Sequence, residues 1–74
     1  MDLRAIGSRI KNARERRQMT QGELAEIVDV STNHISVIER GVKPPKLDTF
    51  VSITNALEVS PDTLLQDVVK HSTK

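Results

Sequence analysis

Apolar residues recur at spacings of three and four along most of the chain, which is the period of an amphipathic helix. The first such run lies between Asp2 and about Arg17, and the alternation typical of a strand is absent throughout. The pattern therefore predicts an all-α domain of five helices joined by short connections. The apolar positions of the five runs are Leu3, Ile6, Ile10 and Ala13; Leu24, Ala25, Ile27 and Val28; Ile35 and Ile38; Leu47, Phe50, Ile53 and Leu57; and Leu64, Leu65, Val68 and Val69.

Short motifs mark where these helices begin and end. Thr20 and Glu23 have the spacing of a capping box, in which the hydroxyl and the carboxylate each bind a backbone N–H group. The second helix is therefore expected to start after Thr20 and to end near Val28. Other boundary signals are an N-cap at Ser31, a stop at Gly41, a loop at Pro44-Pro45, and an N-cap with a first-turn proline at Ser60-Pro61.

The second and third helices have the spacing of a helix-turn-helix. Such a unit needs a small residue where the helices cross, a turn former between them, and branched apolar residues to fill the angle. Counted with Gln21 as position 1, these residue types are needed at positions 5, 9, 15 and 18. The residues at these positions are Ala25, Asp29, Ile35 and Ile38. Asp29 meets the turn requirement in part, because aspartate tolerates a left-handed conformation less well than glycine.

The segment TQGELAEIVDVSTNHISVIERGVKPP resembles the lambda-repressor-like helix-turn-helix proteins of the Cro/C1 type, the XRE family. The downstream SPDTLL resembles the fifth helix of that family, so the likeness covers about residues 3–67. It implies a compact five-helix domain that binds double-stranded DNA through its third helix. Two positions depart from the family pattern, since Asp29 and Gln18 stand where glycine is common. Both departures predict a strained left-handed residue, at a cost of about 1 kcal/mol each.

A helical wheel of the third helix separates a core face from an outward face. Ile35, Ile38 and Glu39 share one side, so the opposite side is expected to face solvent. Short polar side chains can pair with base edges, and valine can contact a thymine methyl group. The same polar residues could also be a solvated helix face, and the family resemblance favours base reading. The candidate base-reading residues are Thr32, Asn33, Ser36 and Val37.

Glu39 is a carboxylate on the core-facing side of that helix. A buried charge is costly without a partner, so a cation is expected to meet it. Arg14 and Arg17 both flank the apolar stripe of the first helix. The resemblance selects Arg14 as the partner in a structural ion pair, and the alternative is a solvent-exposed Glu39.

Phosphate contacts are expected at two places. The N-terminus of the second helix suits an anion, and the resemblance makes Gln21 a phosphate contact there, with a second role in bracing residue 32. Arg40 and Lys43 lie at and beyond the end of the third helix, where the family also touches the DNA backbone. Lys46 is a weaker candidate. The basic residues that would add only long-range attraction are Arg9, Lys11 and Arg16.

Composition narrows the class of protein further. The chain has 74 residues, no cysteine, one aromatic residue and a net charge of +1, but residues 1–20 alone hold six Lys or Arg against two Asp or Glu. This length predicts one domain, over residues 1–70, followed by a frayed tail at 71–74. No apolar run could span a membrane, no residues have metal-ligand spacing, and no catalytic or cofactor motif is present. A non-enzymatic, cytoplasmic protein is therefore expected.

These features together predict a transcriptional repressor that binds a palindromic operator as a dimer. Apolar residues on more than one side of the last helix suggest the dimer contact, through Leu64, Leu65, Val68 and Val69. Two alternatives remain open. The chain could be the antitoxin of a toxin–antitoxin pair that represses its own operon, or a protein-interaction module without affinity for DNA.

Overall fold

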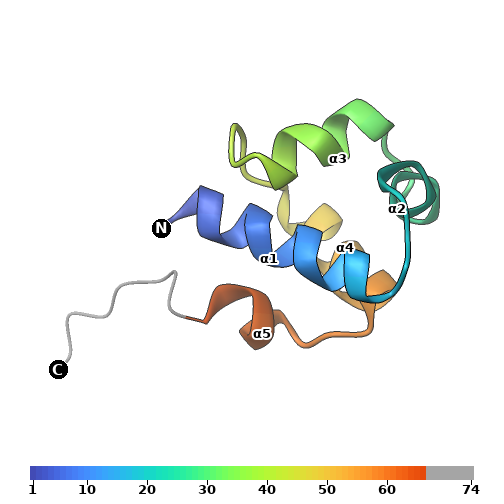
Figure 1. The fold of residues 1–74 in the computed structure, drawn as a ribbon. Helices are drawn as coiled ribbons and strands as arrows, with labels where there is room; N and C mark the ends of the chain where they lie inside the picture. The colour runs from blue at the N-terminus through green and yellow to red at the C-terminus, as the bar shows by residue number, and fades with distance from the viewer. Residues whose placement is uncertain (67–74) are drawn as a thin grey trace, which may run out of the picture.

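The computed structural model describes residues 1–66, and this part of the chain folds into five helices without a strand (Figure 1). The predicted all-α fold is therefore confirmed. Val68, Val69 and the expected tail at 71–74 lie outside the described residues. The helices are α1 (Leu3–Arg16), α2 (Gln21–Val28), α3 (Thr32–Glu39), α4 (Leu47–Leu57) and α5 (Pro61–Leu65).

The helix N-termini lie where the sequence signals predict them. Thr20 and Glu23 form the complete capping box: the Glu23 N–H donates to Thr20 Oγ1 at 3.0 Å, and the Thr20 N–H donates to Glu23 Oε1 at 2.8 Å. Ser31 and Ser60 cap α3 and α5 in the same way, each with its hydroxyl accepting from the backbone three residues on. Each of these caps satisfies an N–H group that the helix itself leaves without a partner.

Among residues 1–66, three connections contain a non-glycine residue in the left-handed region. Gln18 has φ 58° and Asp29 has φ 61°, so both predicted departures from glycine adopt the conformation that glycine favours. Glu58, at the C-terminus of α4, has φ 57° and was not predicted to do so. After α3 the left-handed residue is a glycine: Gly41 has φ 74°.

Replacing Gln18 with glycine is expected to raise the free energy of unfolding by about 0.5–1 kcal/mol, since glycine removes the left-handed penalty at the cost of some chain entropy. Urea denaturation followed by circular dichroism measures the change. Lys11→Gly is the matched control, because Lys11 lies inside α1, where glycine should instead lower stability by about 1 kcal/mol. A loss of stability in Gln18→Gly would contradict the strain.

All five helices contribute to one apolar core. Helix α1 runs through the middle of the molecule, with α3 packed on one side of it and α5 on the other (Figure 1). Helix α4 packs against α2 and also contacts α1, so both α2 and α4 contribute to the same core. The core residues that are almost wholly inaccessible to solvent are Ile10, Leu24, Ile35, Ile38, Ile53, Leu57 and Leu64.

Two apolar residues expected in the core are exposed instead. The exposed fractions are 59% for Ile27 and 79% for Leu47. In α2 the buried stripe is narrow and consists of Leu24, Ala25 and Val28, so Ile27 falls beyond its edge. Leu47 is the first residue of α4 and follows the exposed loop before that helix, where no neighbouring helix covers it. Helical spacing alone predicted that both side chains are buried, and that prediction was wrong.

Candidate nucleic-acid interface

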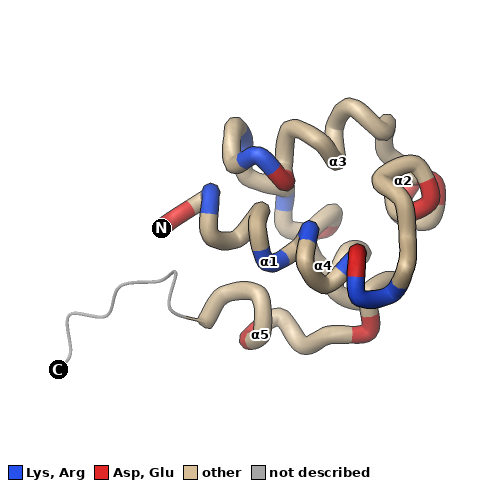
Figure 2. The backbone as a smooth tube through the Cα atoms, in the orientation of Figure 1, with Lys and Arg blue, Asp and Glu red and all other residues tan. Residues whose placement is uncertain are grey.

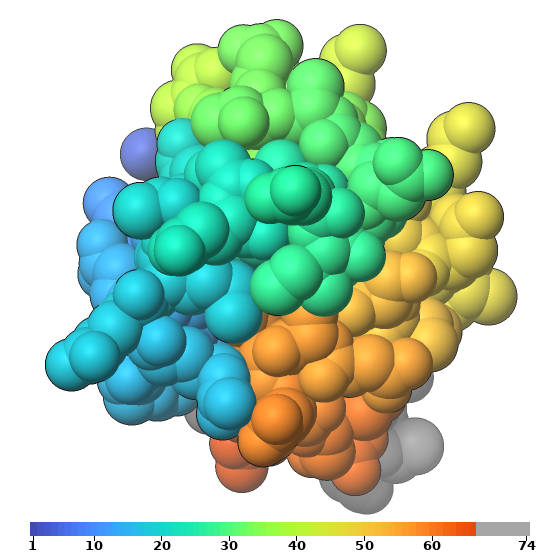
Figure 3. All heavy atoms as spheres, turned by 90° about the vertical axis from the view of Figure 1, so that its right-hand side faces the viewer, coloured from blue at the N-terminus to red at the C-terminus, as the bar shows by residue number. Residues whose placement is uncertain are grey.

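Helices α2 and α3 form a helix-turn-helix unit with the turn at residues 29–31. Ala25 is buried where the two helices cross, and its carbonyl accepts a hydrogen bond from the Val30 N–H at 3.0 Å. A larger residue at position 25 would separate the helices. In the space-filling view, α2 and the start of α3 form one continuous surface (Figure 3).

The outward face of α3 carries uncharged polar side chains. Thr32 and Asn33 are exposed, whereas Ser36 and Val37 are half-buried. Within residues 1–66, the side chain of Asn33 makes no hydrogen bond. Its two N–H donors and its carbonyl oxygen are therefore available to a ligand. Figure 2 shows that α3 has no charged residue before Glu39 at its end. The face thus offers hydrogen-bonding groups in place of fixed charge, which suits the reading of base edges.

The cations predicted to contact phosphates flank this face at the end of α3. Arg40 is exposed and donates from Nε to the hydroxyl of Ser36 at 3.3 Å. That bond holds the guanidinium beside the outward face of the helix. Lys43 is also exposed, in the loop that follows Gly41, and Lys46 is exposed just before α4.

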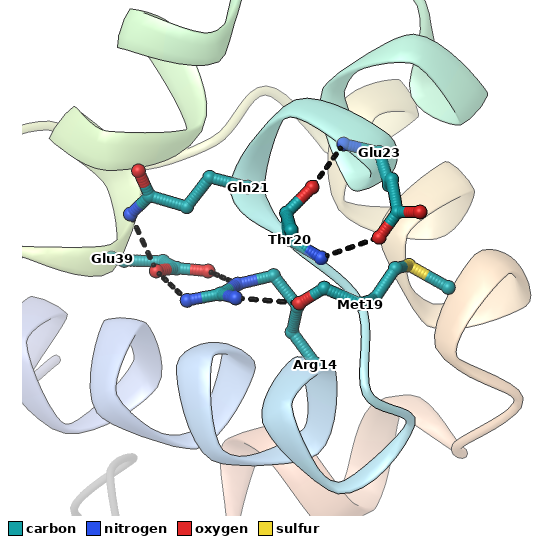
Figure 4. A network of polar contacts seen from close by, with 6 residues as sticks. All are labelled: Arg14, Met19, Thr20, Gln21, Glu23 and Glu39. Atoms are coloured by element: carbon teal, nitrogen blue, oxygen red, sulfur yellow. Dashed lines mark hydrogen bonds and ion pairs between the residues drawn. The ribbon is translucent and has the colours of Figure 1, made fainter.

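A buried polar network fixes α3 against α1 (Figure 4). Arg14 Nε donates to Glu39 Oε2 at 2.7 Å, and Nη2 donates to Oε1 at 3.1 Å, which makes the ion pair bidentate. The exposed fractions of Arg14 and Glu39 are 7% and 6%. The hydrogen bond with Glu39 raises the pKa of Arg14, against the opposite effect of burial, so the guanidinium stays charged. The structure thus brings together Arg14 and Glu39, whereas Arg17 pairs with Glu58 at the surface at 3.3 Å.

The same network also includes Met19, in the connection between α1 and α2, and Gln21, the first residue of α2. The third donor of Arg14, Nη1, binds the carbonyl of Met19 at 2.7 Å and so fixes the connection between α1 and α2. Gln21 Nε2 donates to Glu39 Oε1 at 2.9 Å. Gln21 is therefore braced against Glu39 and not against Thr32, which corrects the second role expected for it. The physical reason is that Glu39 offers a charged acceptor within reach, and a charge-assisted hydrogen bond is stronger than one to a neutral hydroxyl.

Gly7 is a positioning residue that the sequence analysis missed. A Cβ atom at this position would lie 2.5 Å from the carbonyl oxygen of Ile38 and closer still to that of Glu39, so the backbones of α1 and α3 approach each other directly. A Cβ atom at Gly41 would likewise lie 2.7 Å from the Cα atom of Arg4. The signal for Gly7 was a glycine inside a helical pattern, which lowers helix stability and so points to close packing.

A metal site and a membrane-spanning helix are both absent from the described residues. Among residues 1–66, no group of three or more His, Cys, Asp or Glu side chains could hold a metal ion. None of the helices in that range has the length and apolar character needed to cross a bilayer.

Comparison with known proteins gives concordant matches. The family HTH_3, described as helix-turn-helix, matches residues 10–64. The HTH-type transcriptional regulator ImmR of Bacillus subtilis is 38% identical over 61 residues, which cover 82% of this chain and 48% of ImmR. This chain therefore spans about half the length of that relative.

Two solved structures with DNA are similar in fold. The c2 repressor of Salmonella phage P22, in complex with a synthetic operator, has a TM-score of 0.78 and 34% identity, covering 82% of this chain and 92% of the other. SinR of Bacillus subtilis, a master regulator for biofilm formation solved in complex with DNA, has a TM-score of 0.77 and 35% identity, with coverages of 82% and 98%. Both are relatives of this chain in sequence and in structure.

Proposed function

The chain belongs to the HTH_3 helix-turn-helix family, and on that premise we propose that it is a transcriptional regulator that binds specific sequences of double-stranded DNA and acts as a repressor. One observation carries the proposal. The outward face of α3 is uncharged and polar, while its inner side is held to α1 by the buried Arg14–Glu39 pair. A rigidly held helix with such a face suits the major groove.

The base-reading residues are Thr32, Asn33, Ser36 and Val37. Asn33 is the principal one, because a free amide can bond an adenine in a bidentate manner. Val37 can pack against a thymine methyl group. Gln21, Arg40 and Lys43 bind phosphates on either side of the groove, which sets the register of α3 on the duplex.

Replacing Asn33 with alanine is expected to weaken binding to the preferred operator by about 1–3 kcal/mol and to leave binding to random DNA nearly unchanged. Fluorescence anisotropy with both duplexes measures the two affinities. Asn55→Ala is the matched control, since Asn55 is an exposed asparagine on α4 and should affect neither affinity. Equal losses on operator and random DNA would remove the base-reading role of Asn33.

Repression would follow from occlusion, since a protein on the operator competes with polymerase. This function needs no catalysis, and it operates in the cytoplasm. The protein acts as a homodimer on a palindromic operator. Leu64 is not available to a second copy because it is completely buried in the core. The proposed contact therefore involves the half-buried Leu65, together with Val68 and Val69 outside the described residues.

Selection from a randomised duplex library at about 150 mM salt tests the proposal. Enrichment of a two-fold symmetric motif is expected, and a half-site without symmetry would remove the dimer. Retention without enrichment, lost as salt rises, would leave only nonspecific attraction and overturn the function. In that case the protein-interaction alternative takes its place. If a motif is enriched, co-purification of a small toxin would instead identify an antitoxin that represses its own operon.

A further inference from the structure

A cavity of about 200 Å³ lies between α1 and α5. It is lined by Arg9, Asn12 and Arg16 from α1, and by Thr63 and Leu64 from α5. Helix α3 packs on the other side of α1, so this cavity is separate from the face that carries Asn33 (Figure 1). The proposed reading of DNA uses none of its residues.

The three residues from α1 share one side of that helix because they are spaced three and four apart. Their side chains present two guanidinium groups and an amide, and Thr63 adds a hydroxyl from the facing helix. The nearest acidic residues in sequence are Glu15 and Asp62, and neither is among the described residues that line the cavity. The described lining thus concentrates positive charge and hydrogen-bond donors in one hollow.

We propose that this cavity binds the phosphate group of a small anionic molecule. Arginine is the side chain best suited to phosphate, because its planar guanidinium donates two parallel hydrogen bonds. Arg16 is exposed, so its guanidinium can turn towards an anion in the cavity. The volume suits a phosphate with a small substituent, since cavities for drug-sized ligands begin near 300 Å³. Leu64 provides an apolar wall for that substituent.

Arg16 is the residue on which to test the site. Its side chain is exposed, so its replacement should leave the fold intact, whereas Arg9 is half-buried and has a polar interaction of its own. Lys11 offers a matched control, because it is an exposed cation on the same helix that does not line the cavity. Arg16→Gln and Lys11→Gln remove the same charge from α1.

The experiment is an NMR titration of the free protein with inorganic phosphate and, separately, with glycerol 3-phosphate, each up to about 50 mM with chloride adjusted to hold ionic strength constant. Saturable shifts are expected at Asn12 and Thr63. Arg16→Gln should weaken binding by about tenfold or more, and Lys11→Gln by less than about twofold. Tighter binding of glycerol 3-phosphate identifies a small phosphate ester as the ligand, and equal or weaker binding identifies phosphate alone.

Two results would overturn the proposal. One is the absence of saturable shifts with either probe, and the other is equal weakening by the two variants, which would indicate only general attraction to α1. The titration contains no DNA, so its outcome is independent of the proposed repressor function.

Discussion

Replacing Glu39 with alanine is expected to lower the free energy of unfolding by about 3–5 kcal/mol. The carboxylate receives two hydrogen bonds from Arg14 and one from Gln21. Without it, the buried Arg14, which is 7% exposed, is left without its charge partner at the contact between α1 and α3. Urea denaturation at neutral pH, followed by circular dichroism, measures the loss.

Two further variants distinguish the effect of the buried ion pair on stability from the effect of a surface ion pair. Arg17→Ala removes a surface ion pair with Glu58 and should change stability by less than about 0.5 kcal/mol. The double variant Arg14→Met with Glu39→Leu removes both buried charges, and it should recover most of the stability that Glu39→Ala loses. A change below about 0.5 kcal/mol in Glu39→Ala itself would show that the pair does not hold α3 in place.

Replacing Gly7 with alanine is expected to cost about 3 kcal/mol, at the upper end of the range for overpacked sites. The added methyl group would meet the backbone carbonyls of Ile38 and Glu39, and a backbone cannot rotate away as a side chain can. Helices α1 and α3 must therefore move apart, which also weakens the Arg14–Glu39 pair. Thermal and urea denaturation both measure this loss.

Gly22→Ala is the matched control for this variant. A Cβ atom at Gly22 has the Thr32 hydroxyl oxygen as its nearest neighbour, at an ordinary contact distance of 3.6 Å. Alanine is also the better helix former, so stability should stay the same or rise by up to about 1 kcal/mol. If the two variants behaved alike, the close approach of α1 and α3 at Gly7 would be refuted.

The sequence predicted those features of the fold that depend on near neighbours. The Thr20–Glu23 capping box and the Ser31 cap join residues three apart, so the signal and the structure coincide. The left-handed residue at Asp29 was predictable because the turn between α2 and α3 has a fixed length. Glu39 could be assigned to the core from the wheel of α3 alone, but choosing Arg14 over Arg17 needed the family resemblance.

The features that were not predicted depend on contacts between distant segments. A glycine inside a helical pattern points to close packing at Gly7, but the sequence does not say that the carbonyls of α3 are the groups that come close to it. Leu47 fits the period of α4, yet its exposure depends on where the other helices end. The bond from Gln21 to Glu39 depends on the angle between two helices, which the spacing of residues does not give.

The complete burial of Leu64 has a consequence for how the protein is made. All the candidate DNA-contacting residues lie between Gln21 and Lys46, so the ribosome synthesises them well before α5. Domains generally fold as units, and here the core on which α3 rests is not complete until Leu64 docks. A nascent or truncated chain that ends before α5 would therefore carry every one of those contact residues and still lack the folded surface that presents them.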